Sequence, residues 1–164
     1  MKPGFAPLLL TVLLTAGCAG VPQSLQAGDD AAAVVARLGP PTAEFPLPGG
    51  GRRLQYASGP FGKHTWLVDL DAAGRFLRWE EALTEANFAR IEAGLTTAQL
   101  RERLGPPARV WAVHYRDQTV WTYRFENFQC LVFHVGITPQ GVVEDTSYGP
   151  DPACDRDRHL GLGG

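Results

Sequence analysis

The fold is decided by a stretch of sequence that occurs twice, as AGDDAAAVVARLGPP at residues 27–41 and as AGLTTAQLRERLGPP at residues 93–107. The two copies align without a gap at a shift of 66 residues. Further along, LQY at 54–56 aligns with WTY at 121–123, and WLV at 66–68 aligns with FHV at 133–135, at a shift of 67. Such a nearly constant shift is typical of an internal repeat, so the chain is predicted to contain two copies of one module.

Each copy opens with the signals of a short helix. Paired aspartates or threonines supply an N-terminal cap, because their side-chain oxygens accept hydrogen bonds from the first free amides. The apolar residues that follow fall on one side of a helix, and a glycine with two prolines ends it. These signals are Asp29, Asp30, Val34, Val35, Leu38 and Gly39 in the first copy and Thr96, Thr97, Leu100, Leu104 and Gly105 in the second.

Strand signals follow each helix. They are runs of residues that alternate in polarity, separated by turns at residues 72–74 and 138–141. The predicted strands are residues 64–71 and 76–79 in the first copy and residues 110–115, 120–125, 130–137 and 142–143 in the second.

Between the two copies, Thr84 caps a further predicted helix that runs through Phe88 and Ile91 and ends near Gly94. The sequence therefore predicts an α+β protein of two tandem repeats, each with short helices packed on a small antiparallel sheet. We place the repeats at residues 25–80 and 84–148 and a C-terminal tail at residues 149–164.

Several motifs of the second copy together suggest a family. They are GLT at 94–96, Leu100, LGPP at 104–107, WTY at 121–123, LVF at 131–133 and GVV at 141–143. This set resembles the SmpA/OmlA domain of BamE-like outer-membrane lipoproteins, and the first copy resembles it more weakly because GDD stands at 28–30. The resemblance implies a helix pair on a three-stranded sheet. A doubled module is also similar in fold to the secreted β-lactamase inhibitor protein.

The N-terminus has the pattern of a lipoprotein signal peptide. Lys2 precedes an apolar run at residues 8–14 that is too short to span a bilayer permanently. The run ends in LTAGC, which resembles a lipobox, so residues 1–17 are predicted to be removed, Cys18 to carry lipid and residues 18–24 to form a linker. An ordinary secretory signal is the alternative. Ala19 and Gly20 lack the aspartate of inner-membrane retention, which favours the periplasmic face of the outer membrane.

The remaining cysteines and the net charge narrow the setting. Cys130 and Cys154 are predicted to form a disulfide in an oxidising compartment, with two separate buried thiols as the alternative. Loss of Lys2 leaves 14 of 15 basic residues against 17 acidic ones, a net charge of −3 without a basic cluster. Nucleic acid is therefore not expected as a partner, and the membrane is expected to be contacted through the lipid alone.

No motif for catalysis, a metal or a cofactor stands out. Residues 69–74 with Glu80 match much of a calcium loop, but Ala73 occupies its fifth position, so a hairpin turn is predicted. The four histidines and the paired cysteines lack the spacing of a zinc site. The tryptophans at positions 66, 79, 111 and 121 are predicted to lie in the core. We therefore expect no enzyme, no metal and no cofactor.

The alternation of the strands predicts a functional face on the outside of the sheets. Its candidate partner-binding residues are His114, Arg116, Arg124 and His134, with Thr122 beside them and Gln55, Asp69, Asp71 and Arg78 as first-copy counterparts. The inward set is Trp121, Tyr123, Phe125, Leu131, Phe133 and Val135. We expect a non-enzymatic module that binds an envelope protein; the alternatives are an inhibitor of an envelope hydrolase, a merely solvated face, or a site in the loops after the Pro-Pro turns.

Overall fold

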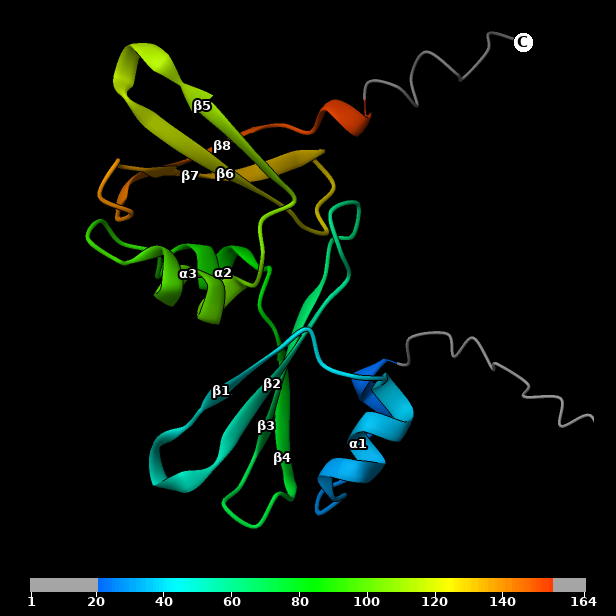
Figure 1. Ribbon diagram of the computed structural model, residues 1–164. Coiled ribbons are helices and arrows are strands. Elements are labelled where there is room, and N and C mark those ends of the chain that lie inside the picture. The colour runs from blue at the N-terminus through cyan, green and yellow to red at the C-terminus, as the bar shows by residue number, and fades with distance from the viewer. Residues whose placement is uncertain (1–20, 155–164) are drawn as a thin grey trace, which may run out of the picture.

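The computed structural model describes residues 21–154, which fold into two units that each carry a four-stranded sheet (Figure 1). The first unit comprises α1 (Ala31–Leu38), β1 (Ala43–Pro46), β2 (Arg52–Ala57), β3 (Thr65–Leu70) and β4 (Phe76–Glu81). The second comprises α2 (Glu85–Phe88), α3 (Thr97–Leu104), β5 (Arg109–Val113), β6 (Gln118–Arg124), β7 (Leu131–Ile137) and β8 (Val143–Pro150). Three short 3-10 turns lie at Pro22–Ser24, Pro48–Gly50 and His114–Arg116.

Each sheet is an antiparallel meander in chain order, β1-β2-β3-β4 and β5-β6-β7-β8. The predicted α+β class and the tandem repeat of helix-on-sheet units are therefore confirmed. The sheets have four strands, not the three that the family resemblance implies, because the chain after each Gly-Pro-Pro turn pairs with the next strand. Among the described residues, no helix is long and apolar enough to cross a membrane.

The caps of the two equivalent helices form as the sequence predicts. The Ala33 amide donates to the Asp30 carboxylate at 2.8 Å, and the Gln99 amide donates to the Thr96 hydroxyl at 3.2 Å. Gly39 and Gly105 end the helices at φ values of 84° and 86°, a conformation that glycine adopts without a steric penalty. The same backbone geometry therefore starts and stops α1 and α3.

Each helix packs on the inner face of its own sheet. In the first unit, Val34 and Leu38 of α1 are buried against Leu54, Val68 and Leu70. In the second unit, residues of α2 and α3 and of the segments that flank them pack against the apolar side of β6 and β7. All six side chains predicted to turn inward belong to this second core or pack against it, which confirms the predicted orientation: Trp121, Tyr123, Phe125, Leu131, Phe133 and Val135.

The opposite, outer face of the first sheet supports the helices of the second unit. The Gln55 amide donates to the carbonyl oxygen of Arg101 in the last turn of α3 at 2.9 Å. Leu67 lies on the same face and lines a small hollow with Ile91 and Leu104. The units are thus stacked in the order α1, first sheet, α2 and α3, second sheet, as Figure 1 shows.

This stacking corrects part of the predicted outer surface. Gln55 and Asp69 were expected to face solvent, but only 2% and 4% of their surfaces are exposed. Gln55 lies under α3, and Asp69 is enclosed by the guanidinium groups of Arg53 and Arg78. Arg78 itself is exposed, as predicted. Asp71 accepts hydrogen bonds from the Ala73 and Arg75 amides and closes the predicted hairpin turn.

Candidate protein-binding surface

The outer face of the second sheet lies at the end of the stack. The residues of this face form two rows across the strands. One row is Thr122, His134 and Ser147, and the other is Val120, Gly136 and Asp145. Among residues 21–154, no helix lies over its centre (Figure 1). A hollow of about 320 Å³ opens on this face. It is lined by Trp111, Val113, Tyr115, Arg116, Gln118, Val120, His134, Gly136, Asp145, Thr146 and Ser147.

Two aromatic side chains border the hollow. Trp111 on β5 is 39% exposed, and Tyr115 in the turn that follows is 90% exposed. Large aromatic side chains bury much apolar area on contact and lose few rotatable bonds, so they often anchor protein interfaces. The sequence reasoning placed Trp111 in the core and overlooked Tyr115. Their position on and just after the first, edge strand of the meander is the signal that could have identified them.

A chain of hydrogen bonds fixes the histidine of the hollow. The Trp111 indole donates to the Thr122 hydroxyl at 3.3 Å, and that hydroxyl lies 3.0 Å from Nδ1 of His134. The hydroxyl accepts from the indole and, in the tautomer that we assign, donates its own proton to Nδ1, which leaves the imidazole proton on Nε2. Burial lowers the pKa of His134, which keeps the ring neutral at physiological pH. His134 therefore presents an N–H donor.

An ion pair holds the other side of the hollow. Arg116 donates to Asp145 at 2.8 Å, with both side chains about half exposed. The buried Gln118 amide bridges Glu144 and Asp145 at 2.9 and 3.2 Å. A Cβ atom at Gly136 would lie 2.2 Å from this amide, so a side chain there would displace the amide from this position. The floor of the hollow is thus held by paired polar groups, while its aromatic rim stays open.

The structure brings together two of the four predicted partner-binding residues. Arg116 and His134 both line the hollow. His114 is exposed but lines a separate shallow depression with Asp117 and Pro139. Arg124 does not line the hollow and its side chain is largely covered, so its prediction as a partner-binding residue is not supported by its contacts.

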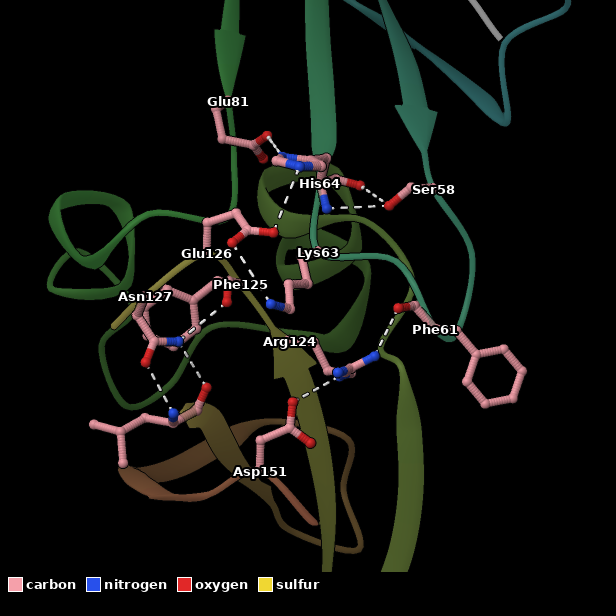
Figure 2. Close-up of polar contacts among 11 residues, drawn as sticks. Ser58, Phe61, Lys63, His64, Glu81, Arg124, Phe125, Glu126, Asn127 and Asp151 are labelled. Atoms are coloured by element: carbon pink, nitrogen blue, oxygen red, sulfur yellow. Dashed lines mark hydrogen bonds and ion pairs between the residues drawn. The ribbon is translucent and has the colours of Figure 1, made fainter. Parts of the chain in front are cut away.

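Arg124 instead joins three segments of the fold (Figure 2). It donates through Nε to Asp151 at 2.8 Å and through Nη1 to the carbonyl oxygen of Phe61 at 2.7 Å. These bonds connect β6 to the C-terminal segment and to the β2–β3 loop of the first unit. Sequence alternation gave its face correctly but could not show that two distant segments cover it.

A second hollow, of about 610 Å³, lies beside this junction. Its polar groups pair with one another: His64 Nδ1 lies 2.8 Å from Glu81, and Lys63 lies 3.5 Å from Glu126, as Figure 2 shows. The Lys63–Glu126 pair joins the two units and the His64–Glu81 contact lies within the first, so we assign both a structural role. Among the described residues, no cluster of histidine, cysteine and carboxylate side chains is suited to a metal ion.

The remaining sequence predictions fall near or beyond the ends of the described chain. Cys130 and Cys154 come together as two thiols, and the hydrogen bond between them raises the pKa of Cys154. The Asp151 amide donates to the Cys130 carbonyl at 2.7 Å and holds the two segments side by side. The disulfide stays a prediction. Cys18, the signal peptide at residues 1–17 and residues 155–164 of the tail lie outside the described residues.

No family model matches the chain, and none of the curated proteins matches it. Among solved structures, a DUF4309 family protein, YjgB, from Bacillus subtilis subsp. subtilis str. 168 aligns with it at 19% identity. The alignment covers 74% of this chain and 78% of the other, with a TM-score of 0.30. So loose a superposition supports no inference about function.

Proposed function

We propose that this protein is a non-enzymatic binding module of the cell envelope, which recognises another protein through the outer face of its second sheet. The observation that carries the proposal is the unequal use of two equivalent faces. The first sheet uses its outer face to support α3, with Gln55 as a donor to the helix. The second sheet offers the same face uncovered, with exposed Trp111 and Tyr115 at a hollow.

The chemistry of the hollow suits recognition. The aromatic rim supplies apolar contact area, His134 supplies a neutral donor, and the ion pair of Arg116 and Asp145 can be exchanged for contacts with a partner. Its polar groups pair with one another, and we assign none of them a catalytic role.

A photo-crosslinking experiment in intact envelopes tests this proposal. A benzophenone amino acid at position 115 should give a discrete adduct with a second polypeptide, which mass spectrometry identifies. The matched control is position 77, because Leu77 is apolar and 57% exposed but lies on the first sheet and lines neither hollow. Equal adducts at both positions, or none at position 115, would contradict the proposal. An envelope hydrolase as the adduct would favour the inhibitor alternative.

The envelope setting rests on the sequence of residues 1–20. We propose that Cys18 carries lipid and tethers the module to the periplasmic face of the outer membrane. Metabolic labelling with palmitate should mark the wild-type protein, and Cys18→Ser should abolish the label. Labelling that persists in Cys18→Ser would exclude this anchor without affecting the proposed binding surface.

A further inference from the structure

We propose that the hollow on the second sheet binds the outer side of α1 of a second copy of this chain, so that copies associate head to tail. This inference rests on the proposed function and names the partner of its surface. Within one chain, the first unit already contacts the second. We infer that the same contact forms between two chains.

The contact within the chain provides the template. The last turn of α3 lies on the outer face of the first sheet, where Gln55 donates to the carbonyl oxygen of Arg101 at 2.9 Å. Gly105 approaches so closely that a Cβ atom there would lie 3.0 Å from Thr65. The repeat aligns α3 with α1 and the first sheet with the second. A further copy would therefore place its α1 on the free face of the second sheet.

The two sheets differ in the charge of their outer faces, and the two equivalent helices, α1 and α3, differ in charge in the same sense. The outer face of the first sheet carries Arg53, Asp69, Arg78 and Glu80, whose counterparts in the second sheet are Val120, Gly136, Asp145 and Ser147. The helix on the charged face is α3, with three charged residues: Arg101, Glu102 and Arg103. In contrast, α1 carries only Arg37, which pairs with Asp29. Of these four counterparts only Asp145 is charged, and it pairs with Arg116, so a helix with one charged residue matches the face with fewer charges.

The solvent side of α1 is unusual for the terminal helix of a stack. Terminal repeats normally present a polar outer face, but here Val35 and Ala36 stand where α3 has Arg101 and Glu102. Val35 is exposed in the structure, and so is Val21 before the helix. This apolar side would be covered by the aromatic rim of the hollow, Trp111 and Tyr115.

The hollow also offers the donor that the template requires. Gln55 is the donor on the first sheet. Its counterpart on the second sheet, Thr122, is hydrogen-bonded to Nδ1 of His134. The free Nε2–H of His134 would donate to the last carbonyl groups of the incoming α1, as Gln55 does to those of α3. The contact is heterologous, because one copy contributes the hollow and the other copy contributes α1.

Sedimentation velocity of the detergent-solubilised full chain tests the inference. The wild type should self-associate with concentration, and Trp111→Glu or Val35→Glu should each weaken association by about thirtyfold or more, as expected for a central interface residue. Leu77→Glu, which alters neither surface, is the control. A mixture of the two variants should form 1:1 heterodimers and nothing larger, because each variant retains one intact end.

A wild type that stays monomeric at all concentrations, or a mixture of variants that stays monomeric, would overturn the inference. Should Trp111→Glu not fold, a benzophenone amino acid at position 115 should still crosslink to residues 31–38 of another copy. If Val35→Glu instead loses binding to phosphatidylethanolamine and phosphatidylglycerol vesicles while the wild type is monomeric, α1 contacts a membrane and the inference is wrong. If the benzophenone amino acid at position 115 of the Val35→Glu variant forms adducts with a different envelope protein, the proposed function holds but the self-association does not.

Discussion

The two units have the same backbone topology but differ in their surroundings. The first begins with a helix that has solvent on its outer side and a sheet that supports its neighbour; the second has helices held between two sheets and a sheet whose outer face is open. Tyr56 and Tyr123 occupy equivalent positions, yet the Tyr123 hydroxyl donates to the Gly105 carbonyl at 3.3 Å while the buried Tyr56 hydroxyl has no partner. The role of a residue therefore depends on the place of its unit in the stack.

The largest expected effect tests the helix between the two sheets. Leu104→Ala should lower the free energy of unfolding by about 4 kcal/mol and Leu38→Ala by about 2.5 kcal/mol, because both leave cavities but Leu104 also packs toward the first sheet. Urea denaturation measures both. Equal losses would show that α3 gains nothing from the first sheet.

The predicted disulfide would be a cross-link that the first unit lacks, since Lys63 stands at the position equivalent to Cys130. Reduction should lower the free energy of unfolding by about 3 kcal/mol, as expected for a closed loop of about 25 residues. The Cys130→Ser, Cys154→Ser double variant should be insensitive to reductant. Intact mass should rise by two protons on reduction, and free thiols in freshly purified protein would refute the pairing.

Arg124 is a further feature of the second unit alone, because its counterpart is Ala57. Arg124→Ala should lower the free energy of unfolding by about 3 kcal/mol, since it leaves the buried Asp151 carboxylate unpaired. Arg116→Ala is the matched control: its ion pair with Asp145 is half exposed, and its loss should cost about 0.5 kcal/mol. If the two variants melt alike, Arg124 does not connect the segments as described.

The charged outer face of the first sheet should make the protein sensitive to acid. Burial raises the pKa of Asp69, but hydrogen bonds and charges of Arg53 and Arg78 outweigh it, so the pKa lies below its ordinary value. The contribution of the Asp69 carboxylate to the free energy of unfolding is therefore fully present above the pKa of about 4 that it has in the unfolded chain. This contribution is lost as the pH falls through the lower pKa of the folded state. Asp69→Asn should cost about 2 kcal/mol at neutral pH. Melts from pH 7 to pH 2 should then show less acid destabilisation than the wild type; an unchanged profile would reject this role.

The smallest expected effect is the difference between the two tyrosines. Tyr123→Phe should cost about 1 kcal/mol through its lost hydrogen bond, whereas Tyr56→Phe should be neutral or slightly stabilising because that hydroxyl is buried without a partner. Paired thermal melts at one pH distinguish them. Equal shifts would mean that the two hydroxyls have similar environments.

The sequence by itself determined the repeat, the caps of α1 and α3, and which residues of β6 and β7 turn inward. These features depend on near neighbours and on the period of helix or strand, both of which are visible in a single chain. The same alternation correctly placed Thr122 and His134 on the outside of the second sheet, whereas Arg116 reaches the hollow from the 3-10 turn after β5.

Only the tertiary structure decided which outer face stays open. Gln55 and Asp69 have the same alternation as residues of the second sheet, yet the first sheet's outer face lies under α3 and the guanidinium groups beside it. Arg124 is enclosed by Phe61 and Asp151, which are distant in sequence. Alternation assigns a side chain to a face, but burial depends on which distant segment packs there, and that follows from how the two units stack.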